Sequence, residues 1–222
     1  MTATAGRPFA GFTLLELMIV SVILSIGAAV LVLMGTRSRI IGCHSNPGAA
    51  LKQLATHEAV WRTQDTDRNG VADFWTRDVA AFHGLHDRKG QPIAFICLSF
   101  ARADAAPGAC YAALGGVSTP KPGPGLGYYL QAMVLDQDGR PYLQPGLPPP
   151  AAPNAPAGVC THATRFGFTA FPAAYGPDAK LIYVVNEDGV VWQKDQGWAG
   201  PVLHRGAAAP PGADATWTQF GG

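Results

Sequence analysis

The sequence Gly11-Phe12-Thr13-Leu14-Leu15-Glu16-Leu17-Met18-Ile19-Val20 decides how this protein is built, because an uncharged apolar run begins inside it. The run continues to Met34 and reaches about the 18 residues that indicate a membrane-spanning helix. A carboxylate beside such a run is costly in lipid, so Glu16 should have a partner or a function.

The segment from Gly11 to Glu16 resembles the processing site of type IV pilins and of the pseudopilins of type II secretion. In that family a membrane peptidase cuts after the glycine, the new N-terminal phenylalanine is usually N-methylated, and the fifth mature residue is a glutamate. The resemblance implies that prepilin peptidase removes residues 1–11 as a leader and that Phe12 becomes the methylated N-terminus. A secretory signal would be cut after its apolar segment, whereas this cut precedes it, so the apolar helix stays in the mature protein.

The resemblance also gives Glu16 a role in assembly. In the family's filaments this glutamate is thought to pair with the charged N-terminus of a neighbouring subunit, and each ion left alone in apolar surroundings would cost several kcal/mol. A proper stagger satisfies both charges, so Glu16 is expected to set the register between subunits. The alternative is a plain single-pass anchor in which Glu16 lies at the level of the lipid headgroups.

The charges around the apolar run and the family orientation point in opposite directions. The leader offers only Arg7 and the initiating amine, whereas Arg37 and Arg39 follow the run. On the positive-inside rule alone, the C-terminal side would be cytoplasmic. We adopt the family orientation, because the cysteines also fit an oxidising compartment. We therefore expect a single-pass inner-membrane protein with its body outside the cytoplasm and a periplasmic or extracellular filament.

The composition bounds the size and the partners of the chain. Of its 222 residues, 16 are Lys or Arg and 15 are Asp or Glu, and loss of Arg7 with the leader leaves 15 of each. This balance provides no basic field, so no nucleic-acid partner is expected. Residues 65–222 suffice for one body of ordinary size, and the 27 glycines and 19 prolines indicate many loops.

Four cysteines, Cys43, Cys97, Cys110 and Cys160, are present, and none belongs to a Cys-x-x-Cys pair. An even count outside the cytoplasm is compatible with two disulfides, for which three connectivities exist. The pair Cys97–Cys110 closes the shortest loop and is the first prediction. Cys43 is alternatively a free, buried thiol.

One long N-terminal helix is expected over residues 12–64, with its membrane-spanning part at 12–35. Pro47 removes a backbone donor and clashes with the preceding turn, so the helix should kink or break there. Ser45 or Asn46 would cap the new start, with Pro47 in the first turn.

The body carries helix, strand and turn signals that together predict an α+β fold, in which the long helix packs on a small antiparallel sheet. The expected elements are a short helix near 91–104 and strands at 127–135, 140–143, 165–171, 180–186 and 190–194. Hairpin turns are expected at 136–139 and 187–189. An exposed Pro- and Ala-rich loop is expected at 145–158 and a loose tail at 206–222, with Trp217 and Phe220 tucked in.

The body also resembles many uncharacterised bacterial pilin-like proteins, more loosely than the N-terminus resembles pilins. The segments that carry this resemblance are Asp67-Arg68-Asn69-Gly70-Val71-Ala72-Asp73-Phe74-Trp75, Gly127-Tyr128-Tyr129 and 184–191. The resemblance implies a pilin-type body and no established activity.

The segment 65–73 has the oxygen spacing of a calcium loop. Donors stand at its first, third, fifth, seventh and ninth positions: Asp65, Asp67, Asn69, the Val71 carbonyl and Asp73. Gly70 at the sixth position permits the sharp turn of an EF-hand type of loop. The twelfth position is Thr76 rather than a bidentate glutamate, and Asp78 is the candidate substitute. The alternative is a polar turn that ends the helix, because Asp, Asn and Gly are the usual turn residues.

No residue pattern predicts catalysis, so we expect the protein not to be an enzyme. For Cys160 and His162 we expect a disulfide cysteine and a surface histidine rather than a nucleophile and its base. His83 and His86 have no evident third metal ligand. The sequence contains no Gly-x-Ser-x-Gly, P-loop or dinucleotide motif.

The predicted function is structural: the mature subunit polymerises by helix bundling into a type IV pilus-like or type II secretion filament. The expected partners are other copies of the chain, prepilin peptidase, the assembly platform with its ATPase, and the inner membrane. The alternative is a membrane-anchored binding or enzymatic domain that never polymerises and faces the periplasm or the cell exterior. That alternative would need a convergent polar pocket.

Overall fold

A computed structural model describes most of the body and part of the N-terminal segment. The described residues are 14, 16, 18–23, 46–86, 90–108, 120–123, 127–136, 138–177, 179–202 and 216–221. The chain divides into two compact units, Met1–Arg39 and Ile40–Gly222.

In the first unit, the described residues are helical and exposed. They are Leu14, Glu16 and residues 18–23. No helix among the described parts of the chain is both long and apolar enough to cross a membrane. Most of the expected span 12–35 and all of 24–45 lie outside the described residues, so the part of the long helix before residue 46 stays a prediction.

The body begins with the helix α2, Pro47–Gln64, and its start confirms the predicted break. Asn46 is extended and is the N-cap residue, since its side-chain oxygen accepts a hydrogen bond from the Gly48 N–H at 2.9 Å. Pro47 occupies the first turn, where a missing N–H costs nothing. The helix ends at Asp65, whose φ of 45° lies in the left-handed region that closes many helices.

One face of α2 is buried, and it includes a carboxyl group. Leu51, Leu54 and Trp61 are fully buried on this face, as their spacing predicts. Glu58 interrupts the apolar stripe, yet it is fully buried too. Its Oε2 accepts the backbone N–H of Trp75 at 3.0 Å, so Glu58 ties the helix to the first strand of the body.

The main sheet has five antiparallel strands in the order β2-β4-β5-β6-β7. Its strands are β2 Tyr128–Ala132, β4 Gly167–Pro172, β5 Leu181–Asn186, β6 Val191–Asp195 and β7 Thr218–Gln219. The β5–β6 hairpin is confirmed at its predicted turn, where Gly189 has φ 68° and its N–H reaches the Asn186 carbonyl at 2.9 Å. The sheet confirms the predicted antiparallel body.

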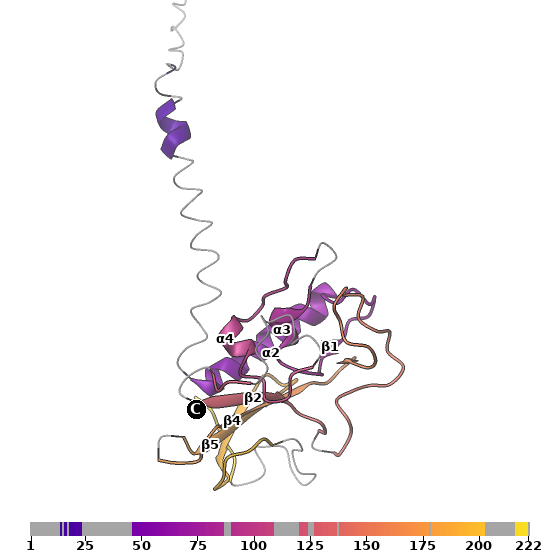
Figure 1. Cartoon of the computed structure of the whole chain (residues 1–222), viewed down its shortest axis with the longest axis vertical. Helices are drawn as coiled ribbons and strands as arrows, with labels where there is room; N and C mark the ends of the chain where they lie inside the picture. The colour runs from indigo at the N-terminus through magenta and orange to yellow at the C-terminus, as the bar shows by residue number, and fades with distance from the viewer. Residues whose placement is uncertain are drawn as a thin grey trace, which may run out of the picture. The chain divides into compact units, whose positions relative to one another are not determined.

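The helix α2 covers one face of this sheet and packs against β4, β5 and β6 (Figure 1). Alternate residues of the strands point to opposite faces. On the helix side lie buried residues that include Leu130, Phe168, Tyr183 and Val185. A smaller cluster of Met133, Tyr142 and Val184 is covered by Trp192, Val202 and Trp217. Both faces of the sheet are therefore partly covered by apolar side chains.

A second, two-stranded sheet joins β1, Phe74–Trp75, to β3, Thr161–His162. Two helices of one turn each follow β1: α3, Ala81–Gly84, and α4, Leu98–Ala101. The predicted helix over 91–104 is therefore wrong in extent. Ile93 and Phe95 donate their N–H groups to Leu85 and Phe82 instead, and Ala94 has φ 47°, so a helix cannot form before residue 98.

The predicted strand at 140–143 is also wrong, although its turn is present. The Gly139 N–H reaches the Asp136 carbonyl at 3.2 Å, but only a single bridge joins Leu135 to Pro141. Pro141 lacks an N–H and cannot donate to a ladder at that position.

The Pro-rich loop and the tail are both attached to the body. Residues 145–158 contain no helix or strand, as predicted, but Asn154 accepts the His86 N–H at 2.8 Å and donates to the Gly84 carbonyl at 2.6 Å. At the C-terminus β7 pairs with β6, and the Phe220 ring packs edge-on against Tyr183 with centroids 5.8 Å apart. Within the described tail, the expected tucking of Phe220 is confirmed.

Candidate functional site

Within the N-terminal processing segment Gly11 to Glu16, only Leu14 and Glu16 are described. Gly11 and Phe12 lie outside the described residues, so cleavage and methylation stay predictions. Glu16 is helical and exposed within its own unit. Met18, Ile19, Val22 and Ile23 are each more than half exposed there, which gives this short segment an apolar surface.

The loop 65–73 connects the end of α2 to β1, and its backbone follows a tight turn. The Gly70 N–H donates to Asp65 Oδ2 at 3.1 Å, and Gly70 has φ 81° with open space where a Cβ would stand. The Val71 N–H donates to Asn69 Oδ1 at 2.8 Å, and Asn69 Nδ2 donates to Asp73 Oδ2 at 2.9 Å. These bonds orient the first, fifth and ninth positions of the predicted calcium loop.

The carboxylates of the loop are buried and incompletely paired. Asp67 and Asp73 are each 1% exposed. Four carboxylate oxygens are buried without a hydrogen-bond partner: Asp65 Oδ1, Asp67 Oδ1 and Oδ2, and Asp73 Oδ1. Buried polar atoms are normally paired, because leaving one unpaired costs roughly 1–3 kcal/mol.

The electrostatics of the loop follow from this burial. Burial raises the pKa of Asp67 to about 7, and the negative charges of Asp73 and Asp65 add to the effect. Burial also raises the pKa of Asp73, against the opposing hydrogen bonds from Asn69 and Thr161. Burial and mutual repulsion thus make full ionisation of the loop carboxyl groups unfavourable.

In the part of the chain that the structure describes, neither Arg62 nor Arg68 forms an ion pair with the loop carboxylates. Arg62 donates from Nε to the Ala72 carbonyl at 3.2 Å, and its guanidinium lies 5.0 Å from the centroid of the Phe74 ring. Among the described residues, the ion pairs join Arg140 to Asp138 and Arg165 to Asp136, outside the loop.

Neither candidate for the twelfth ligand position faces the loop as a free donor. Thr76 Oγ1 bonds to the Tyr142 carbonyl at 2.9 Å. Asp78 accepts the backbone N–H groups of Ala81 and Gly108, at 2.9 and 2.8 Å. As the side chains stand, no three Asp, Glu, His or Cys groups in the described chain converge closely enough to hold a metal ion.

A second carboxyl pair, Asp78 and Asp104, has a structural role that the sequence did not reveal. Asp104 Oδ2 accepts the N–H groups of Val79 and Ala80 at 2.6 and 2.9 Å, and Oδ1 accepts that of Ala106 at 3.0 Å. Burial, with the nearby charge of Asp78, raises the pKa of Asp104 to about 7. Unlike those of the loop, these oxygens are satisfied by the backbone.

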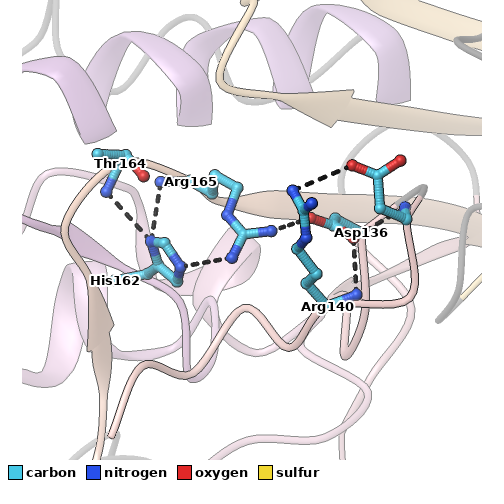
Figure 2. Close-up of polar contacts among 6 residues, drawn as sticks. Asp136, Arg140, His162, Thr164 and Arg165 are labelled. Carbon is cyan, nitrogen blue, oxygen red and sulfur yellow. Dashed lines mark hydrogen bonds and ion pairs between the residues drawn. The ribbon is translucent and has the colours of Figure 1, made fainter. Parts of the chain in front are cut away.

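The pair Cys160 and His162 is not arranged for nucleophilic catalysis. His162 is buried rather than on the surface, and its Nδ1 accepts the N–H groups of Thr164 and Arg165, both at 3.1 Å. Figure 2 shows the Arg165 side chain lying between the His162 ring and Asp136, and Arg165 Nη2 lies 2.9 Å from His162 Nε2. The network therefore fixes the start of β4.

The thiol of Cys160 is free and buried in the structure, and Cys43 and Cys110 lie outside the described residues, so the expected disulfide role of Cys160 stays a prediction. Its Sγ donates to the Gly158 carbonyl at 3.4 Å, and burial raises its pKa. A reactive cysteine needs the opposite shift. The Cys97 thiol is also free and half-buried, with its Sγ 3.2 Å from Ser99 Oγ, and Cys110 lies outside the described residues, so their pairing stays a prediction.

The two histidines of the α3 region do not share a helix face. His83 lies in α3, where Nδ1 is 2.7 Å from the Ile96 carbonyl. His86 follows the helix, and its backbone N–H is held by Asn154. The two histidines are therefore not arranged as a pair of metal ligands on one helix face.

Comparison with known proteins places the chain by its N-terminus alone. No curated protein and no solved structure matches the sequence, so the resemblance of the body to other pilin-like proteins stays unconfirmed. Residues 6–32 match the family model described as the prokaryotic N-terminal methylation motif. The chain therefore carries the N-terminal signature of type IV pilins and pseudopilins, the substrates of prepilin peptidase.

Proposed function

We propose that this protein is a structural subunit, a pilin or pseudopilin, of a type IV pilus-like or type II secretion filament. The observation that carries the proposal is the motif over residues 6–32, with Glu16 as the fifth residue after the expected cut. The commitment of Cys160 and His162 to structural hydrogen bonds supports a structural role over an enzymatic one.

In the proposed mechanism, prepilin peptidase cuts after Gly11 and Phe12 becomes the methylated N-terminus. The body stays outside the cytoplasm while the apolar helix holds the subunit in the inner membrane. The assembly platform and its ATPase then add the subunit to a filament, where the helices bundle and Glu16 sets the register. The exposed apolar side chains of residues 18–23 support this step, because such a surface is stable in lipid or against a neighbouring helix.

Mass spectrometry of the mature N-terminus, combined with electron microscopy of sheared cell-surface and periplasmic material, tests the proposal. We expect a methylated Phe12 and filaments that contain the protein. Gly11→Leu should block cleavage, whereas Gly6→Leu, a glycine replaced inside the leader, should leave cleavage intact. Wild-type protein that keeps Met1 contradicts the cleavage. Correctly processed protein that is never found in filaments favours the anchored domain that does not polymerise.

A further inference from the structure

The unpaired carboxylate oxygens of the loop 65–73 need an explanation, and the fold offers no internal one. Asp67 is 1% exposed, and neither of its carboxylate oxygens accepts a hydrogen bond of normal geometry, although the Asn69 N–H and the Asp65 side chain lie close enough to influence it, while Asp65 and Asp73 each contribute one further unpaired oxygen. The buried pair Asp78 and Asp104 shows that this body can satisfy carboxylates with backbone N–H groups. In the loop, by contrast, the bond from the Gly70 N–H to Asp65 Oδ2 still leaves four buried carboxylate oxygens unpaired, and these are suited to a cation supplied from outside the chain.

The donor chemistry selects the kind of cation. The loop offers only oxygen donors, and hard cations such as Ca²⁺ and Mg²⁺ prefer oxygen over nitrogen or sulfur. Ca²⁺ accepts six to eight oxygens in a flexible arrangement, including carbonyl groups, whereas Mg²⁺ demands octahedral geometry and sheds its waters reluctantly. A mixed set of carboxylate, amide and carbonyl oxygens on one turn therefore suits Ca²⁺.

We infer that the loop 65–73 binds one calcium ion. The ligands are the side chains of Asp65, Asp67, Asn69 and Asp73 and the main-chain carbonyl of Val71. Water would complete the shell, because Thr76 and Asp78 are bonded elsewhere. The inference concerns the body alone and does not rest on the filament proposal.

Binding requires the three carboxylates to turn toward a common point, since they do not converge as they stand. The cost of this movement is small in hydrogen bonds, because each carboxylate already has an unpaired oxygen to offer. Asn69 Oδ1 has two lone pairs, so it can keep the Val71 N–H and still coordinate the ion. The bond from Asn69 Nδ2 to Asp73 Oδ2 leaves Asp73 Oδ1 available in the same way.

An ion at this position would tie three segments of the body together. The loop ends α2 at Asp65 and leads into β1, whose Trp75 is fully buried. The Pro-rich loop lies across it, because the Ala151 N–H donates to the Asp67 carbonyl at 2.8 Å and the Pro148 carbonyl lies 3.4 Å from Asn69 Nδ2. Calcium should therefore stabilise the fold as a whole. Only three charged ligands point to the weak affinity of extracellular modules, on the order of 0.1–1 mM.

The test compares wild type, Asp67→Asn and the control Asp138→Asn, each as the purified full chain in mild detergent. Thermal unfolding is followed by tryptophan fluorescence in EDTA, in calcium and in magnesium. Calcium at ten times Kd should raise the wild-type and Asp138→Asn midpoints by about 3–6 °C, and magnesium should raise them less. Asp67→Asn should unfold at or above the wild-type temperature in EDTA, because it removes a buried charge, and should not respond to calcium.

Calorimetric titration of the wild type with calcium decides the question if Asp67→Asn does not fold. Heat with a Kd near or below 1 mM that is lost in Asp73→Asn supports the site. No binding at 10 mM calcium overturns the inference, as does a calcium shift of equal size in Asp67→Asn and wild type. An equal response to magnesium overturns it for calcium.

Discussion

Residues 6–32 match a known family model, whereas the body that follows has no matching curated protein or solved structure. In proteins with this motif, a peptidase and the membrane recognise the N-terminal segment through a few residue types at fixed spacing along the chain. The body is held by a core such as Trp61, Phe82 and Phe168, where many apolar combinations of the right volume serve equally well. Its sequence can therefore diverge while its fold persists.

The two regions therefore carry different information about function. The N-terminal motif indicates the pilin and pseudopilin class, but it carries no information about what a filament of this protein would contact. The body must carry that specificity, and its unusual features are buried polar groups rather than surface motifs. Fold alone does not assign a function, so the two regions have to be tested separately.

The largest expected effect tests whether the two regions are independent. Trp61→Ala removes a fully buried ring whose centroid lies 5.3 Å from that of Trp75 and 5.5 Å from that of Phe82. The free energy of unfolding should fall by about 3–5 kcal/mol, as measured by circular dichroism in urea. Trp198→Ala, at a residue 53% exposed, is the matched control and should have little effect.

Cleavage of the Trp61→Ala precursor after Gly11 should continue, because the peptidase reads the linear segment before the body. Mass spectrometry of the membrane fraction checks this. If cleavage fails while the control is processed normally, the two regions are coupled, and their proposed independence is wrong.

The second-largest effect is expected at Glu16, where a substitution should change filament assembly but not the stability of the body. Glu16→Ala should leave membrane insertion and the unfolding of the body unchanged but reduce filament yield by about tenfold or more, since an unpaired N-terminal charge costs several kcal/mol. Quantitative immunoblots of sheared filaments against the membrane pool measure this yield. Asp138→Ala, an exposed carboxylate of the body, should assemble normally. Wild-type yield from Glu16→Ala would refute the register role.

Local signals predicted much of the fold where they agreed with long-range packing. Asn46 and Pro47 marked the start of α2, and the turn 187–189 marked the β5–β6 hairpin, because caps and tight turns depend on adjacent residues. The helix expected over 91–104 is wrong in extent, although its apolar residues have helical spacing. The N–H groups of Ile93 and Phe95 bond to the carbonyls of Leu85 and Phe82, about ten residues earlier in the chain, instead of forming helical hydrogen bonds. Periodicity cannot show where backbone donors go.

The sequence predicted which residues make up the candidate loop 65–73, but not how deeply they are buried or which hydrogen bonds they form. The spacing from Asp65 to Asp73 identified the donors, yet only the structure shows that Asp67 is buried without hydrogen bonds. Glu58 looked like a flaw in an apolar stripe, and it proves to hold the N–H of Trp75. Asp104 carried no signal at all, since its partners at 79 and 80 lie far away in sequence.

A smaller effect is expected in how the free energy of unfolding of the body depends on pH. The pKa of Asp104 is about 7 in the fold against an ordinary 3.8, so the folded body keeps a proton that the unfolded chain has lost. The free energy of unfolding should therefore fall as pH rises from about 4 to about 7, by at most about 1.4 kcal/mol per pH unit for this group. Urea unfolding in EDTA measures the slope. Asp104→Asn should reduce this slope, to which the raised pKa values of Asp67 and Asp73 also contribute, and Asp138→Asn should leave it unchanged; a slope that Asp104→Asn does not reduce contradicts the assignment.

The smallest effect lies at the border between the two regions, at Asn46. In the structure Asn46 caps α2, so Asn46→Ala should cost the body about 1 kcal/mol, and Asn46→Asp should preserve most of its stability. If α2 instead continued a helix that runs unbroken from residue 12, position 46 would lie in its interior. Alanine is the best helix former there, and Asn46→Ala would then stabilise the protein. The sign of the change in urea unfolding of the full chain thus decides whether the body begins with its own helix or extends the one that the motif begins.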